Sequence, residues 1–160
     1  MWAASRAARR SSCGRSTQSL ELMSDSNEQY AYFTIYGEFD PAEITRHVGV
    51  EPTDAWRKGD RHPRRGTEAR FSRWSLRSRL GKDVELELHI ADVLSQLAQN
   101  EVAFREVSAK HNGTMQLVGY FHTYYPGLYF EPETIASLAK YSLGMDLDFY
   151  ALWSDARDDA

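Results

Sequence analysis

Alternation of apolar and polar side chains is the feature that most constrains what this chain can fold into. In one segment, Trp74, Leu76 and Leu80 fall on one side of an extended chain, and arginines fall on the other. Residues 114–124 alternate in the same way, and residues 30–39 are rich in the aromatic and β-branched side chains that favour strands. Successive side chains of a strand point to opposite faces of a sheet. The sequence therefore predicts a sheet with one apolar face.

Helix signals separate these segments. Asp40 followed by Pro41 marks a helix start, and Gly49 marks its end. Two further helices follow from apolar residues at helical intervals, and a last helix opens at Glu131-Pro132. The predicted order is β-α-β-α-α-β-β-α-β. Its strands are 30–39, 71–80, 114–124, 128–130 and 146–153, its helices span about 41–48, 83–99, 102–110 and 132–143, and residues 51–70 form a turn-rich stretch.

This order of elements predicts the fold class. Strands and helices mixed in this way favour an α+β fold in which a mainly antiparallel sheet has its helices packed on one face. A ferredoxin-like arrangement with an inserted helix is the simplest plan of that kind. The expected domain spans residues 27–153.

The two ends of the chain are expected to lie outside this domain. Residues 1–26 are interpreted as a disordered leader, because the first 22 residues are rich in Arg, Ser and Ala without apolar periodicity. Met23 opens an ordinary polar start, so the residues before it are read as upstream sequence or, alternatively, as a targeting segment. Residues 154–160 are expected to form a flexible acidic tail.

Composition excludes several classes of protein. Cys13 is the one cysteine, which excludes a disulfide framework and a zinc site built on several thiolates. No run approaches the roughly 18 apolar residues of a membrane helix. A cytoplasmic location is therefore expected.

The formal net charge of −4 conceals a strongly basic block. Residues 56–82 carry ten basic and two acidic groups, whereas residues 83–160 carry four basic and thirteen acidic groups. Such a block could bind an anionic partner, or it could form ion pairs with the acidic segments of its own chain. Because the flanking parts of the domain are acidic, binding of nucleic acid is the less favoured of these possibilities.

Several short motifs together resemble a known family. They are G-E-F-D-P-A-E-I-T at 37–45, V-E-P-T at 50–53, R-K-G-D at 57–60, W-S-L at 74–76 and M-D-L-D-F-Y at 145–150. In this order and spacing they resemble the bacterial domain of unknown function family DUF 4279, over about residues 30–153. The resemblance implies a small bacterial protein of unassigned function, and it supplies no catalytic residues.

Motifs of catalysis are not recognisable in the sequence. A phosphate-binding loop and a G-x-S-x-G nucleophile motif are absent, and no two of the five histidines have the close spacing of a zinc protease. Asp146 and Asp148 should share one strand face, where they could bind a divalent cation or simply mark the entry of a strand. No cofactor and no metal ion is expected, although an enzyme with an unrecognised site stays an alternative.

The polar side of the predicted sheet is the candidate binding surface. Arginine and tyrosine are enriched at protein interfaces, and aromatic sheet faces also stack nucleic-acid bases. We therefore expect a non-catalytic protein-interaction or regulatory domain with an unidentified protein partner, and nucleic-acid binding through the same face is the alternative. An ordinary exposed sheet face would carry similar residues. The candidate residues are Tyr32, Tyr36, Arg73, Arg77, Arg79, Tyr120 and His122.

Overall fold

The computed structural model describes residues 26–61 and 66–153. The predictions for the leader up to residue 25 and for the tail at 154–160 lie outside these ranges. In chain order the elements are β1 (Glu28–Gly37), α1 (Pro41–Val48), β2 (Asp54–Trp56), β3 (Ser72–Arg77), α2 (Leu86–Leu97), a 3-10 turn (Ala98–Asn100), α3 (Glu101–His111), β4 (Thr114–Phe121), α4 (Pro132–Lys140) and β5 (Gly144–Ala151).

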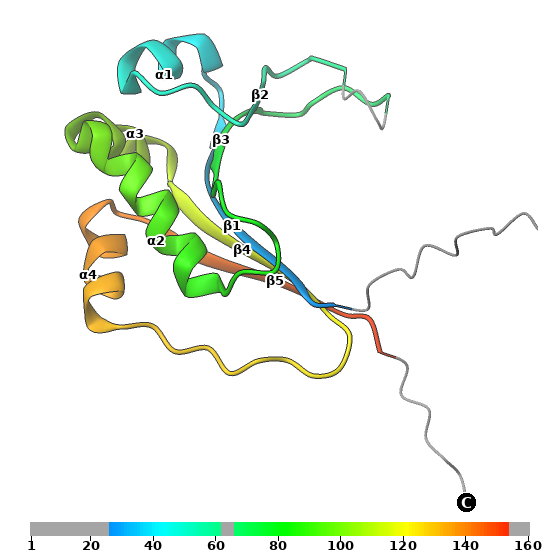
Figure 1. The fold of residues 1–160 in the computed structure, drawn as a ribbon. Coiled ribbons are helices and arrows are strands. Elements are labelled where there is room, and N and C mark those ends of the chain that lie inside the picture. Colours follow the sequence, from blue (N-terminus) through cyan, green and yellow to red (C-terminus); the bar gives the residue numbers. More distant parts are fainter. Residues whose placement is uncertain (1–25, 62–65, 154–160) are drawn as a thin grey trace, which may run out of the picture.

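The strands form one open sheet in the order β2-β3-β1-β4-β5. β1 pairs antiparallel with both β3 and β4, and β2 pairs antiparallel with β3. β4 and β5 run parallel, with α4 in the connection between them. The helices gather on one side of this sheet (Figure 1). The predicted α+β class, with a mainly antiparallel sheet and helices on one face, is confirmed.

The core lies between the sheet and these helices. Trp74 and Phe33 are fully buried on neighbouring strands, and both rings contact Phe104 of α3, with ring centroids 6.0 and 5.8 Å away. The indole N–H of Trp74 donates a hydrogen bond to the Thr45 hydroxyl on α1 at 3.0 Å. A buried indole needs such a partner, so Trp74 ties β3 to α1 as well as filling the core.

Local chemistry explains where two of the helices begin and end. The Asp40 carboxylate accepts a hydrogen bond from the backbone N–H of Ala42, and α1 ends at Gly49, whose φ of 70° suits a residue without a side chain. Asn100 caps α3 by accepting a hydrogen bond from the backbone N–H of Ala103. Its side-chain amide also donates to the Val48 carbonyl, which connects the two helix ends.

β3 is shorter than the alternation predicted, and this corrects the placement of Leu80. The strand ends at Arg77, because the backbone N–H and the guanidinium of Arg79 both donate to the Asp92 carboxylate on α2. The chain therefore leaves the sheet before Leu80, which is 38% exposed and does not join Trp74 in the core.

Two smaller elements also differ from the sequence prediction. β2 lies within the stretch predicted as turns, and residues 128–130 form no strand. Three residues are too few for periodicity to identify, so pairing with β3 rather than local pattern creates β2. None of the helices in the described ranges has the length and apolar character needed to cross a membrane.

Candidate interaction surface on the open sheet face

The open face is the side of the sheet opposite the helices. In each strand, the residues before and after a core residue point to this open face. The register of the strands then places their side chains side by side: Tyr32 pairs with Arg77, and Arg73 lies between Tyr36 and Trp56. Aromatic rings and arginine guanidinium groups therefore lie side by side on one surface. Its members are Glu28, Tyr30, Tyr32, Thr34 and Tyr36 of β1, Asp54 and Trp56 of β2, Arg73, Ser75 and Arg77 of β3, Thr114, Gln116, Val118 and Tyr120 of β4, and Asp146, Asp148 and Tyr150 of β5.

Arg73 lies at the centre of an aromatic frame. Its guanidinium carbon is 4.9 Å from the ring centroid of Trp56, and 5.2 and 5.4 Å from those of Tyr32 and Tyr36. Its Nε donates a hydrogen bond of 2.7 Å to the Ser75 hydroxyl. Guanidinium planes are attracted to the negative faces of such rings. The side chain is thus held in place by contacts with rings and hydroxyls, and no carboxylate of the described residues pairs with its positive charge.

Arg77 repeats this arrangement four residues, or two strand periods, along β3. Its guanidinium carbon is 4.6 Å from the centroid of Tyr30 and 5.9 Å from that of Tyr32. Its Nε is buried and makes no hydrogen bond within the described residues. Among those same residues neither Arg73 nor Arg77 forms an ion pair. Two cations that both contact Tyr32 are therefore partly desolvated on the open face, and neither has a carboxylate partner in the part of the chain that the structure describes.

The β5 end of the open face has the opposite charge. Tyr120 and Tyr150 stack with ring centroids 4.9 Å apart, and the Tyr150 hydroxyl donates a hydrogen bond of 2.8 Å to Asp148. Asp146 lies two residues before Asp148 on the same strand face. The open face therefore has an arginine end at β3, with the exposed Asp54 of β2 beside it, and a carboxylate end at β5.

The tyrosines respond to these surroundings. Burial raises the pKa of Tyr32, and the Arg73 guanidinium opposes this without reversing it. Burial also raises the pKa of Tyr30, and the nearby Tyr120 adds to that effect. The hydrogen bond to Asp148 raises the pKa of Tyr150. All three phenols are therefore neutral at neutral pH, so they surround the arginines as rings and hydroxyls rather than as anions.

Five of the seven residues singled out from the sequence share the open face: Tyr32, Tyr36, Arg73, Arg77 and Tyr120. Arg79 does not, because it follows the end of β3 and its guanidinium binds Asp92 of α2 on the helix side. His122 follows the end of β4, and its backbone N–H donates a hydrogen bond to the Asn27 side chain. Strand alternation therefore does not determine on which face of the sheet its ring lies.

The sequence reasoning omitted Tyr30, Trp56 and Tyr150 from the site. Tyr30 has the same parity as Tyr32, so alternation alone could have included it. Trp56 could not be found in this way, because its strand was not recognised. Tyr150 required the pairing of β5 with β4 to be known.

The family model for a domain of unknown function (DUF4279) matches residues 27–152. The chain belongs to this family. No curated protein shows a significant match to it, and no solved structure does either. The family description assigns no activity, so the function of this DUF4279 domain has to be argued from its own side chains.

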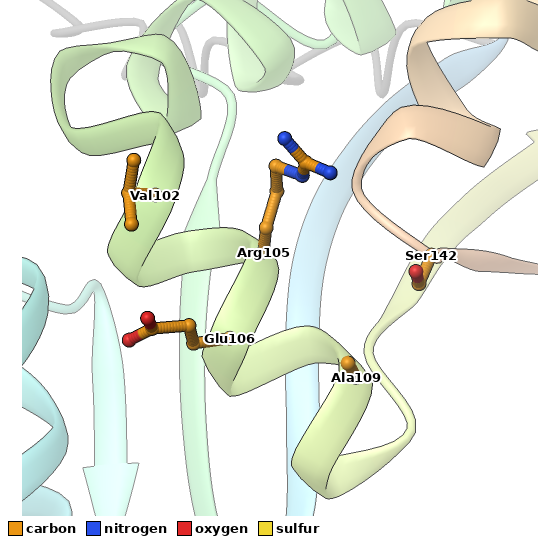
Figure 2. Close-up of a pocket in the computed structure, with 5 residues that line it drawn as sticks. All are labelled: Val102, Arg105, Glu106, Ala109 and Ser142. Atoms are coloured by element: carbon orange, nitrogen blue, oxygen red, sulfur yellow. The ribbon is translucent and has the colours of Figure 1, made fainter.

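Away from the open face, this DUF4279 domain has a hollow of about 370 Å³ beside α3. Figure 2 shows its lining: Val102, Arg105, Glu106 and Ala109 of α3, with Ser142 from the segment after α4. Its charged groups already have partners, because Glu106 lies 3.0 Å from the His47 ring and Arg105 lies 3.8 Å from Glu101. The charged groups that line the hollow are therefore engaged in ion pairs with neighbouring side chains.

The acidic pair on β5 was the candidate for a metal-dependent enzyme. Within the described residues no three His, Cys, Asp or Glu side chains come together in a way that could hold a metal ion. One carboxylate of the pair, Asp148, accepts the Tyr150 hydroxyl. The arginine end of the open face is therefore the stronger candidate for a functional surface.

Proposed function

We propose that the domain is a non-catalytic protein-interaction domain whose open face docks an acidic segment of a partner protein. The observation that supports this most strongly is the pair of arginines, Arg73 and Arg77. Both are half-buried among aromatic rings, and neither has a carboxylate partner among the described residues.

Preorganisation favours this use of the pair. A free arginine loses conformational entropy when it binds a carboxylate, and the aromatic frame has already fixed Arg73 before a partner arrives. A planar guanidinium can bind a carboxylate through two parallel hydrogen bonds. Tyrosine, tryptophan and arginine are also the residues that most often dominate the energy of protein interfaces.

Charge on the rest of the surface favours a short acidic segment over a nucleic acid. Asp146 and Asp148 lie on the same face, and the whole chain carries a net charge of −4. A long polyanion that followed the sheet would meet these carboxylates, whereas a compact acidic segment can stay at the arginine end.

A selection from a library of random peptides displayed on phage tests this proposal. The full chain, the variant Arg73→Gln/Arg77→Gln and the control variant Arg46→Gln/Arg70→Gln are used as baits. The control removes two exposed arginines that form no ion pair among the described residues and do not belong to the open face. We expect the wild type and the control to enrich acidic peptides, with affinity lowered at least about tenfold in the open-face variant.

Two outcomes would overturn the proposal. One is selection without acidic enrichment, and the other is equal binding of the selected peptides to all three baits. Titration with a single-stranded oligonucleotide at low and moderate salt tests the alternative, in which the open face binds nucleic acid. Tight binding that falls steeply with salt would assign the open face to nucleic acid instead.

A further inference from the structure

β5 is the most exposed regular element of the described chain. It is eight residues long, and every one of them except Phe149 is exposed. It forms one edge of the sheet, with β4 as its only strand neighbour among the described residues. Long exposed edges invite pairing with another strand, so proteins usually shorten them or cover them. This edge is neither short nor covered by any described segment.

The pairing with β4 defines which backbone groups of β5 are available. The N–H of Gly144 donates to the Gly113 carbonyl, and the N–H of Leu152 donates to the Phe121 carbonyl. The register between β4 and β5 is continuous from one end to the other. Even-numbered residues therefore bond to β4, and odd-numbered residues such as Met145 and Leu147 turn their N–H and C=O groups outward.

The side chains along this edge have two separate chemistries. Asp146 and Asp148 project on the open face, and Met145 and Leu147 project on the helix side. Leu147 is 46% exposed although it is apolar. An added strand would gain most if it placed basic side chains opposite the aspartates and apolar ones opposite the leucine and methionine.

We propose that β5 binds an extended segment of a partner protein in which basic and apolar residues alternate, so that the segment extends the sheet by one strand. The site is separate from the arginine end of the open face, and its charge preference is opposite. One domain can thereby join two differently charged segments, and either site can exist without the other.

Self-pairing of β5 is disfavoured by the same aspartates. In an antiparallel pair of two copies, opposite residues project on the same face. Two antiparallel registers pair most of β5 with β5 of a second copy. In one, Leu147 lies opposite Leu147 of the other copy, and in the other, Asp148 lies opposite Asp148. The first places Asp146 opposite Asp148 of the other copy, and the second places Asp148 opposite itself. Like charges directly opposite each other destabilise a strand pair, so a basic segment suits the edge better than a second copy.

Binding of synthetic peptides to the full chain tests the proposal. The probe is a fluorescent peptide of alternating lysine and valine, compared with a peptide of the same composition in a non-alternating order and with one of alternating glutamate and valine. Fluorescence anisotropy gives the affinity, and amide hydrogen exchange with and without the probe reports on residues 144–151. We expect the alternating lysine peptide to bind most tightly and to protect the outward amides of β5.

Two variants separate the backbone contribution from the charge contribution. Leu147→Pro removes an outward N–H at a position where an edge strand tolerates proline, and Leu147→Val is its matched control. Asp146→Asn/Asp148→Asn removes the charges and keeps an acceptor for the Tyr150 hydroxyl, with Glu43→Gln/Glu51→Gln as the control of equal charge. We expect at least about tenfold weaker binding for each test variant and wild-type affinity for each control.

Several results would overturn the inference. They are equal affinity for the alternating and non-alternating lysine peptides, unchanged exchange in β5, or a loss as large in the Glu43/Glu51 control as in the aspartate variant. A concentration-dependent dimer of the chain alone, abolished by Leu147→Pro, would also overturn it and would assign the edge to a second copy. None of these results depends on binding to Arg73 and Arg77, so this inference and the proposed function can fail separately.

Discussion

The two faces of the sheet are built from the same strands and differ completely in what holds their side chains in place. On the helix side, Phe33 and Trp74 are fully buried among apolar neighbours. Tyr32 and Arg73 directly precede these two residues in the chain and lie on the open face. They contact each other through a cation–π interaction and keep part of their surface in water. A one-residue step along a strand thus separates a residue that stabilises the fold from one that is available to a partner.

This difference teaches where stability and binding can be altered independently. Removing a buried ring leaves a cavity whose cost adds to the lost transfer free energy. Removing a partly exposed guanidinium loses a few weak contacts and also removes the cost of keeping a charge partly out of water. Substitutions on the helix side should therefore act on unfolding, and substitutions on the open face should act on association.

The largest effect should come from Trp74→Ala. The change removes the ring that packs against Phe33 and Phe104, together with the hydrogen bond to Thr45. We expect a loss of roughly 3–5 kcal/mol in the free energy of unfolding, measured by urea denaturation. Trp74→Phe should lose less, because it keeps most of the ring volume. An alanine variant as stable as the wild type would mean that the two faces are not distinguished as described.

A smaller effect should follow from Asp92→Ala, which breaks the link between β3 and α2. Burial alone would raise the pKa of Asp92, but hydrogen bonds from Arg79 and Gln96 outweigh it and hold the pKa below its ordinary value. The side chain of Asp92 is only 12% exposed. We expect the variant to lose about 1–3 kcal/mol in thermal or urea unfolding, because the backbone N–H of Arg79 and the side chain of Gln96 lose their acceptor.

The stabilising contribution of Asp92 should also depend on pH in a defined direction. Because its folded pKa is lowered, the contribution is present above the unfolded pKa and is lost as the pH falls through the folded pKa. In the Asp92→Ala variant, urea midpoints measured from neutral to acidic pH should fall less than in the wild type. An equal fall in both proteins would show that the carboxylate is not held in its charged form.

His89 should make the fold sensitive to pH in the range just below neutrality. Burial lowers the pKa of its fully buried ring, while its Nδ1 lies 2.8 Å from the Ser78 hydroxyl. The stabilisation is present above the unfolded pKa of about 6.5 and is lost as the pH falls from there through the folded pKa. The slope for one proton is at most about 1.4 kcal/mol per pH unit.

Unfolding of the wild type and of His89→Gln at several pH values checks this expectation. The variant should be less stable at neutral pH but should lose less on acidification. His111 contributes in the same direction, because burial first and Lys110 second lower its pKa, so part of the slope should persist in the His89 variant. A slope that is unchanged by His89→Gln would assign the whole effect to other groups.

The smallest effect on stability should come from Arg77→Gln on the open face. The substitution removes cation–π contacts with Tyr30 and Tyr32 and no ion pair within the described residues. We expect the free energy of unfolding to change by less than about 1 kcal/mol. A loss as large as that of Trp74→Ala would erase the distinction between the faces and would make Arg77 a structural residue.

The sequence predicted the fold better than it predicted which residues share the open face, and the reasons are physical. Alternation in β1, β3 and β4 repeats often enough to separate the two faces, and it correctly placed Trp74 inside. The end of β3 could not be predicted from the sequence pattern, because it depends on a hydrogen bond from the backbone N–H of Arg79 to the Asp92 carboxylate on α2. Trp56 was missed for a related reason: a three-residue strand exists only through its neighbour.

The position of β1 at the centre of the sheet has a consequence for how the chain folds during synthesis. Tyr32 pairs on one side with Arg77 and on the other with Gln116, both of which follow it far along the chain. One edge of β1 therefore stays unsatisfied until β3 has emerged from the ribosome and the other until β4 has, and β5 can dock only after that. Such non-local pairing slows folding and leaves a nascent apolar strand exposed to aggregation. Chains truncated before β4 should consequently aggregate more readily than the 160-residue chain.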